Sequence, residues 1–314
     1  MRLTLVVLAA GRARRFGRLK QLEPVGPSGE PLFEYAVHDA LRAGCERVLF
    51  VTRPDLEARL RAHVEGRFGS SIAVTYVTQA LDDLPRGFRP PPGRRAPWGT
   101  GHAVLAVREH VREPFLACNA DDFYGPTSIG RLARRLQDAL TTGDPSHFLV
   151  GYPLRHTSFS EAGGVNRAIC RCDASLFLEE IEEVRAIRRN GSVITGVGED
   201  GAPCVLTGEE LSSMNLWGFQ PALFGPLWHA FGRFHASTGD PVEGEFPLST
   251  AMGALIAGGR VRVRVVPAED RGHAMTYAED RKAVASAVAE SVAAGDYPTD
   301  LAAWFRRRRG SAPG

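Results

Sequence analysis

The sequence predicts an α/β fold in which helices flank a mostly parallel sheet, with a β-rich insertion and a helical C-terminal tail. Short runs of apolar and β-branched residues recur through the first 150 residues, as in strands that are buried on both faces. Stretches with helical periodicity separate these runs. Alternation of strand and helix gives parallel strands through right-handed crossovers, so the predicted architecture is Rossmann-like.

The first half contains four predicted strands, with two predicted helices between the first three. The strands are residues 3–8, 48–52, 72–77 and 115–118. The helices are residues 31–44, which end at Gly44, and 54–66, which begin at Pro54 and end at Gly66. Ligands of such sheets bind beyond the carboxyl ends of the strands, so we expect the functional site in the loops after residues 8, 77 and 118.

The second half has shorter strands and more turns. A β-rich insertion that covers the sheet is predicted from residues 166–173, 175–184, 192–198 and 212–220. Further along we expect helices at 221–234 and 246–259, a strand at 260–266 and a helix at 278–294. We predict a single domain over residues 1–295, divided into halves at 1–150 and 151–275, and a basic surface tail at 296–314.

Composition excludes several classes of protein. The 314 residues include 38 Lys and Arg against 36 Asp and Glu, so a net charge of +2 gives no strong field to attract nucleic acid. No apolar run approaches the roughly 18 residues that a membrane helix needs. Arg12 follows the first apolar run where a secretory signal would have small residues, and the five cysteines are scattered. We therefore expect a cytoplasmic protein without nucleic-acid or membrane partners, of unknown oligomeric state.

A glycine and several basic residues follow the first strand. Gly11 allows a sharp turn that presents backbone N–H groups to an anion, and Lys20 is one of two lysines in a chain that otherwise uses arginine. The spacing is not that of a Walker A loop, because five residues separate Gly11 from Gly17 and no hydroxyl residue follows Lys20. The loop has phosphate-binding chemistry, and a plain strand-to-helix connection is the alternative.

Two aspartates follow the fourth strand. Asp121 stands at the carboxyl edge of the predicted sheet, opposite the basic loop, where a carboxylate can hold Mg²⁺ while phosphates and water complete the coordination. For Asp122, a simple role as the cap of the next helix is the alternative.

The basic loop resembles the opening signature of the nucleotidyltransferases that make nucleotide sugars, L-A-A-G-x-G-x-R followed by a lysine. The matching residues are Leu8, Ala9, Ala10, Gly11, Arg15 and Lys20, whereas Ala13 replaces the second glycine. The resemblance implies that residues 8–11 and Arg12 contact the nucleotide. It also implies catalytic roles for Arg15, Lys20 and Asp121, the first two on the triphosphate and Asp121 as a metal ligand.

Two further stretches resemble the nucleotide site of this family. Gln79 closes the third strand, and residues 98–103 are similar to the G-T-[AG] turn that contacts the base, which implies nucleotide contacts for Gln79, Gly99 and Thr100. Thr100 is also placed to cap a helix at 101–109. We expect His102 at the surface rather than as a catalytic base. The arginines of the Pro-rich loop 85–98 either bind an anion or, as is more usual, face solvent.

The second half resembles the acceptor site of the family. The implied acceptor contacts are Gly164, Glu183, Arg185 and Asn215. Val184 stands where the family has the lysine of E-E-K-P, with Arg185 beside it. Asn215 has the alternative of pairing buried backbone groups. A second metal aspartate is expected after a late strand, and we assign it to Asp270, with Glu269 and Asp280 as rivals.

The resemblance implies a Mg²⁺-dependent enzyme. A phosphorylated small-molecule acceptor, with a sugar 1-phosphate favoured, would attack the α-phosphorus of a nucleoside triphosphate and expel pyrophosphate. Cytidylyl transfer to a non-sugar phosphate or phosphonate, or transfer to a pterin cofactor, is the alternative among enzymes. A nucleotide-sensing module that has lost catalysis is the alternative from another class.

Overall fold

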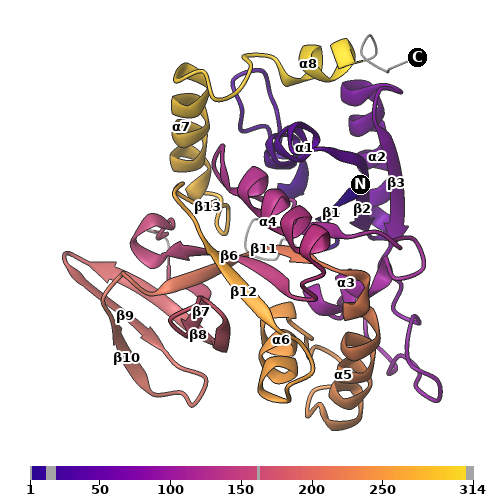
Figure 1. Cartoon of the computed structure of the whole chain (residues 1–314), viewed down its shortest axis with the longest axis vertical. Coiled ribbons are helices and arrows are strands. Elements are labelled where there is room, and N and C mark those ends of the chain that lie inside the picture. The colour runs from indigo at the N-terminus through magenta and orange to yellow at the C-terminus, as the bar shows by residue number, and fades with distance from the viewer. Residues whose placement is uncertain (1, 12–18, 161–162, 309–314) are drawn as a thin grey trace.

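The central sheet continues through both halves of the chain (Figure 1). The structure is a computed structural model that describes residues 2–11, 19–160 and 163–308. Within these residues the sheet has eleven strands. Four neighbouring strands from the first half are parallel, in the order β3 (Ala73–Thr78), β2 (Cys45–Thr52), β1 (Leu3–Leu8) and β4 (Phe115–Asn119).

The sheet then continues with one strand in the opposite direction. β11 (Leu211–Phe219) is antiparallel to β4 and to β6 (His147–Pro153), and β12 (Val263–Pro267) is parallel to β6. This part of the sheet is therefore mostly parallel, as predicted. β6 and α4 (Ser128–Thr142) lie in a stretch for which the sequence analysis assigned no element.

An antiparallel extension carries the predicted β-rich insertion. It contains β7 (Val165–Cys172), β8 (Leu178–Asn190), β9 (Val193–Val197) and β10 (Pro203–Leu206), and it projects from the body of the molecule (Figure 1). β11 joins the two parts, because residues 211–213 pair with β7 and residues 217–219 pair with β4. The ladder to β6 is irregular between Ser213 and Trp217, and Asn215 has a φ of 61° at that break.

Helices cover both faces of the central sheet. The predicted helices α1 (Leu32–Arg42) and α2 (Pro54–Phe68) share one apolar core with α4 and α7 (Asp280–Ala293). The other core contains α3 (Thr100–Ala106), α5 (Phe224–Ser237) and α6 (Leu248–Ala257). Alternate residues of β1 enter different cores, as expected for a strand buried on both faces.

Short elements lie around the edge of the sheet. β5 (Asp122–Phe123) pairs with β13 (His273–Ala274), and the 3₁₀ helices are η1 (Lys20–Leu22), η2 (Leu154–His156) and η3 (Pro221–Leu223). Among the described residues, the helices are too short or too polar to cross a membrane.

The C-terminal segment is not the surface tail that the sequence analysis expected. Residues Leu301–Arg307 form helix α8. Asp300 is its N-cap, and the Asp300 carboxylate accepts a hydrogen bond from the Ala303 N–H (2.8 Å). Leu301 and Phe305 are fully buried in the core that contains α1 and α2, whereas Arg306 and Arg307 are exposed. The predicted helical character of this segment is confirmed, but the prediction gave weight to the consecutive arginines and overlooked the apolar residues that precede them.

Candidate active site

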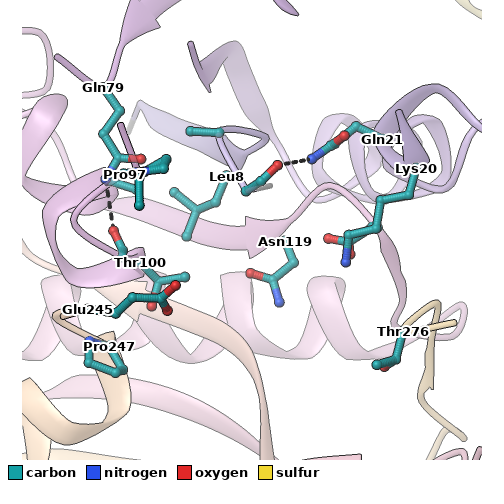
Figure 2. Close-up of a pocket in the computed structure, with 16 residues that line it drawn as sticks. Leu8, Lys20, Gln21, Gln79, Pro97, Thr100, Asn119, Glu245, Pro247 and Thr276 are labelled. Carbon is teal, nitrogen blue, oxygen red and sulfur yellow. Dashed lines mark hydrogen bonds and ion pairs between the residues drawn. The ribbon is translucent and has the colours of Figure 1, made fainter. Parts of the chain in front are cut away.

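A cavity of about 540 Å³ opens at the carboxyl ends of β1, β3 and β4 (Figure 2). Residues from the basic loop, from the aspartate turn and from the turn before α3 all line it. The predicted site residues in its wall are Leu8, Ala10, Gly11, Lys20, Gln79, Gly99, Thr100 and Asp121. The position agrees with the expectation that ligands bind beyond the strand ends of such a sheet.

Lys20 and Asp121 form an ion pair between the Nζ and Oδ2 atoms. Lys20 begins η1, and Asp121 lies in the turn between β4 and β5. Their side chains retain 21% and 16% of their exposure, so both remain accessible to a ligand. The structure thus brings the basic turn and the acidic turn to one cavity.

The backbone of the basic loop is held from two sides. The Ala9 N–H donates to the Val51 carbonyl (2.8 Å), and the Gly11 carbonyl accepts hydrogen bonds from Gln21 Nε2 (2.7 Å) and an Arg53 guanidinium nitrogen (2.5 Å). Gln21 also lines the cavity. Neither Gln21 nor Arg53 belongs to the motif that the sequence analysis used. Ala9 itself is fully buried, and the predicted site residues Arg12 and Arg15 lie outside the described residues.

The other end of the cavity is formed by β3 and the turn before α3. Gln79 Nε2 donates to the Gly99 carbonyl (2.9 Å). Gly99 has a φ of 95°, and a Cβ there would lie 2.8 Å from the backbone oxygen of Phe246, so a side chain would not fit. Thr100 does not cap α3. Its hydroxyl oxygen instead accepts a hydrogen bond from the Leu248 N–H (2.9 Å) at the start of α6.

A smaller pocket of about 220 Å³ adjoins the cavity and shares Thr100, Asn119 and Pro247 with it. Of the predicted acceptor residues, Glu183 and Asn215 line this side pocket. Hydrogen bonds run from Trp217 to Asn215 Oδ1, from Asn215 Nδ2 to Asn119 Oδ1, and from Asn119 Nδ2 to Asp122 (2.8, 2.8 and 2.7 Å). Asn215 therefore pairs side chains, rather than the buried backbone groups of the alternative interpretation.

Comparison with known proteins agrees with this geometry. Residues 5–144 match the MobA-like NTP transferase domain family. A relative in Haloferax volcanii, the UTP–glucose-1-phosphate uridylyltransferase AglF, is 23% identical over 261 residues, which cover 81% of this chain and 84% of that protein. The first half of the chain is therefore a nucleotidyltransferase domain. The resemblance seen in the basic loop is thereby confirmed.

Solved structures of low sequence identity share the fold of this nucleotidyltransferase. A UDP-glucose pyrophosphorylase complexed with UDP-glucose is 16% identical with a TM-score of 0.56, and the match covers 91% of this chain and 98% of that one. A putative glucose-1-phosphate thymidylyltransferase from Bacillus anthracis is 11% identical with a TM-score of 0.59, over 91% of this chain and 95% of that one. The Rossmann-like fold prediction is therefore confirmed.

The buried residues of the side pocket were not evident from the motifs. Arg167 and Asp122 line it and are only 8% and 6% exposed. Asp122 lies in β5 and accepts the Asn119 hydrogen bond, so it is not the helix cap of the alternative interpretation. Burial, followed by the nearby charge of Asp121, raises the pKa of Asp122. A sequence signal existed for Arg167, because it is an arginine among apolar residues of a predicted strand.

Two predicted acceptor residues lie elsewhere among the described residues. The Arg185 side chain is exposed and does not line either pocket. Gly164 also lies outside both linings, and a Cβ on it would come within 2.5 Å of the Ala186 Cα. Its lack of a side chain is thus explained by close packing of the backbone. Arg185 was predicted to contact the acceptor because it stands next to the position of the expected lysine. Its position in β8 instead directs its side chain outward.

Asp270 is not a second ligand beside Asp121. Its carboxylate accepts hydrogen bonds from the Ser128 N–H (2.7 Å) and the Thr127 N–H (3.0 Å) at the start of α4. The rivals are also engaged elsewhere, since Glu269 pairs with Arg131 and Asp280 accepts from the Tyr277 N–H (2.7 Å). Among the described residues, no group of three or more His, Cys, Asp and Glu could hold a metal ion by itself.

The Asp121 carboxylate nevertheless fits a substrate-borne Mg²⁺. Asp121 offers a hard oxygen ligand beside the basic loop, and Thr276 lines the same cavity with a hydroxyl. Mg²⁺ in nucleotide sites takes one or two carboxylates and completes its shell with phosphate oxygens and water.

Two residues around α3 differ from expectation, His102 and Arg94, whereas Arg86, Arg89 and Arg95 of the Pro-rich loop are exposed, as the more usual alternative predicted. His102 is fully buried instead of being at the surface. Arg94, in the Pro-rich loop, is 6% exposed and stacks 3.4 Å from the centre of the Trp98 ring. Its guanidinium donates to the carbonyls of Pro97, Pro241, Val242 and Gly244. Arg94 therefore fastens the loop to the segment before α6, and it neither binds an anion in the cavity nor faces solvent.

Proposed function

We propose that this nucleotidyltransferase joins a nucleoside triphosphate to a sugar 1-phosphate in a Mg²⁺-dependent reaction that releases pyrophosphate. The observation that carries the proposal is the Lys20–Asp121 ion pair in a cavity that adjoins a polar side pocket. The triphosphate would occupy the cavity, and the sugar phosphate would occupy the side pocket. The relative in Haloferax volcanii, which is named for activity on UTP and glucose 1-phosphate, supports this choice of substrates.

The reaction needs alignment and charge stabilisation more than it needs a base. An oxygen of the acceptor phosphate forms a bond to the α-phosphorus, and the bond from that phosphorus to the bridging oxygen breaks to release pyrophosphate. The attacking oxygen is already ionised near neutral pH, so no side chain must remove a proton. The enzyme must hold the two phosphates in line and offset the negative charge that develops.

The residues of the cavity suit these tasks. The Lys20 ammonium would donate to phosphate oxygens next to the α-phosphorus, where its charge matters most in the transition state. Backbone groups of Ala10 and Gly11 would position the nucleotide. Asp121 would hold the Mg²⁺, which supplies further positive charge to the phosphates. The Lys20 ammonium, which pairs with Asp121 in this structure, would then exchange that carboxylate for phosphate.

The side pocket favours a sugar over the other acceptors that we considered. Its described lining combines the amides of Asn119, Asn166 and Asn215 with the carboxylates of Asp122 and Glu183. Sugar hydroxyls both donate and accept hydrogen bonds, so they can use both kinds of group. No aromatic side chain is present among the described residues that line the pocket, although a flat pterin ring would gain most from stacking. Arg167 adds a guanidinium that suits an anionic acceptor.

The test is a panel of nucleoside triphosphates against sugar 1-phosphates, a cytidylyl acceptor phosphonate and a pterin, with pyrophosphate release as the readout. We expect release only with a sugar 1-phosphate, and only when Mg²⁺ is added. Release with the phosphonate or the pterin would contradict the assigned acceptor. Nucleotide binding without release for every acceptor would instead support the nucleotide-sensing alternative.

A further inference from the structure

We propose that His102 locks the Gln79 amide in one orientation, so that the nucleotide site selects bases with a ring N–H: uracil, thymine or guanine. This inference rests on the proposed function, because it takes the main cavity as the nucleotide site. His102 is fully buried and does not line the cavity. It is therefore a positioning residue that acts through Gln79.

A backbone carbonyl fixes the protonation of His102. Its Nε2 lies 2.9 Å from the Asp83 carbonyl oxygen, which can only accept, so Nε2 carries a hydrogen. Burial is the main cause that lowers the pKa of His102, and the charges of Arg108 and Arg94 lower it further. The hydrogen bond and the charge of Asp83 act in the opposite direction, but the pKa remains lowered. The neutral ring therefore has an unprotonated Nδ1, which is a hydrogen-bond acceptor.

Two acceptors then fix the orientation of Gln79. Its Nε2 lies 2.9 Å from the Gly99 carbonyl oxygen and 3.2 Å from His102 Nδ1, so both amide hydrogens have acceptors within the protein. A flipped amide would place Oε1 against the carbonyl oxygen of Gly99 and the lone pair of His102. Both contacts would be repulsive, and the buried nitrogen of His102 would lose its donor.

The locked amide leaves its oxygen for a ligand. Figure 2 shows the Gln79 nitrogen on its dashed line and the amide oxygen directed toward the middle of the cavity. Among the described residues, no hydrogen bond reaches this oxygen. Gln79 is only 5% exposed, so the oxygen has little water to bind once a nucleotide fills the cavity. The site therefore presents a fixed acceptor to the base.

Base chemistry determines which nucleotides meet this acceptor favourably. Uracil, thymine and guanine carry an N–H in the ring, where cytosine and adenine have a lone pair. The amino groups of cytosine and adenine can reach the Gln79 oxygen only if the base moves one position along its edge. The triphosphate, held at Gly11 and Lys20, opposes that movement. A site that is built to pair one polar group rejects the analogue that lacks it.

The surroundings of His102 keep the lock in place. Arg108 holds the Asp83 carboxylate through two hydrogen bonds (2.6 and 2.7 Å), which fixes the residue whose carbonyl binds His102. The Phe231 ring lies 4.8 Å from the His102 ring, centre to centre. These contacts leave His102 little freedom to rotate, and hence Gln79 little freedom to flip.

Dissociation constants of nucleoside triphosphates, measured by calorimetry with Mg²⁺ present, test the proposal. Two pairs match in ring size, UTP with CTP and GTP with ATP. If the site takes pyrimidines, we expect UTP to bind at least about tenfold more tightly than CTP. If it takes purines, we expect the same advantage for GTP over ATP. Methylation gives a test without mutation, since 3-methyl-UTP lacks the ring N–H and 5-methyl-UTP retains it. We expect only the 3-methyl compound to bind at least about tenfold more weakly than UTP.

Variants of His102 test the lock itself. In His102→Leu the ratio of CTP to UTP dissociation constants should fall toward one, because nothing accepts the second Gln79 hydrogen. In His102→Asn the side-chain oxygen can stand near the former Nδ1 and restore most of the ratio. The melting temperature of each variant shows whether it folds, and a purely structural role would change both dissociation constants in parallel. If His102→Leu does not fold, the methylated nucleotides still decide the question.

The outcomes separate this inference from the proposed function. If no triphosphate binds, the proposed function fails. If CTP or ATP binds as well as its partner, or if 3-methyl-UTP binds like UTP, the base selection is overturned while nucleotidyl transfer stands. If folded His102→Leu keeps the wild-type ratio, Gln79 is not held by His102.

Discussion

The main cavity and the side pocket are built on different principles. In the main cavity, backbone carbonyls hold both glutamine side chains, since Gln79 binds the Gly99 carbonyl and Gln21 binds the Gly11 carbonyl. In the side pocket, side chains fix one another across β4, β5 and β11, as in the hydrogen bonds between Asn215, Asn119 and Asp122. Carbonyl positions follow from the fold, so the cavity is set by local backbone geometry. The side pocket depends instead on the identity of several distant residues.

This difference predicts different responses to mutation. A change in the apolar core that packs against α1 and α2 should lower the free energy of unfolding without changing the choice of acceptor. A change in the side pocket should alter use of the acceptor and leave nucleotide affinity nearly constant.

The largest effect on stability is expected from the C-terminal helix α8, which packs in the core that contains α1 and α2. Phe305 is fully buried, and its ring lies 4.4 Å from that of Phe68, centre to centre. We expect Phe305→Ala to reduce the free energy of unfolding by about 3 to 5 kcal/mol, because the cavity it leaves is in a packed core. Denaturant unfolding measures the change. Arg306→Ala, on an exposed neighbour in the same helix, should change stability little, and an equal loss there would mean that α8 is not packed as described.

A smaller effect, confined to catalysis, is expected in the side pocket. We expect Arg167→Met to lower kcat/KM for the sugar phosphate about 100-fold, because a buried charge that faces the acceptor is lost. The dissociation constant of the triphosphate should be nearly unchanged. Arg185→Met is the matched control, since that arginine is exposed and outside both pockets. The distinction between pocket and surface arginines fails if the two variants have equal effects.

The smallest effect is a pH dependence of the free energy of unfolding, which arises from Asp39 in helix α1. Burial raises the pKa of Asp39 to about 6, although His38 and Tyr297 donate hydrogen bonds to it. The unfolded chain loses this proton near pH 4, so between about pH 4 and 6 only the folded protein holds it. Stability from this group is therefore complete below pH 4 and is lost as the pH rises through 6.

Asp39→Asn isolates that contribution. The amide does not titrate, so the variant should lack a decrease of roughly 2 kcal/mol in unfolding free energy that wild type shows between pH 4 and 6. Comparing the two proteins cancels the titration of the other groups. Parallel pH profiles would show that Asp39 is ionised in both states.

The same contrast explains which parts of the site could be predicted from the sequence. Strand ends and glycine turns are local, so residues 3–8 and the positions of Gly11, Gln79 and Asp121 could be predicted from short patterns. The apolar neighbours of Arg167 were a signal of its burial, but its place beside Asp122 could not be predicted, because that place depends on the pairing of β7 with β11 and on the irregular register near Asn215. Asp270 shows the limit of family resemblance, since a carboxylate after a late strand proved to bind the start of α4.

Buried polar residues were the other difficulty. His102 and Arg94 are polar types that usually lie at the surface, and composition alone assigned them there. Their partners are mainly backbone carbonyls from loops far apart in sequence, such as Asp83 and Pro241. Every residue has a backbone carbonyl, so the sequence does not show which carbonyl will accept a hydrogen bond from a buried side chain.

The central claim is that Lys20 stabilises the charge that develops at the α-phosphorus. Its most direct test is the comparison of Lys20→Met with Lys282→Met, because these are the two lysines of the chain and Lys282 is exposed on α7. We predict that Lys20→Met lowers kcat by about 100-fold or more, with much less change in the dissociation constant of the triphosphate, and that Lys282→Met changes neither. Wild-type turnover in Lys20→Met would contradict the account.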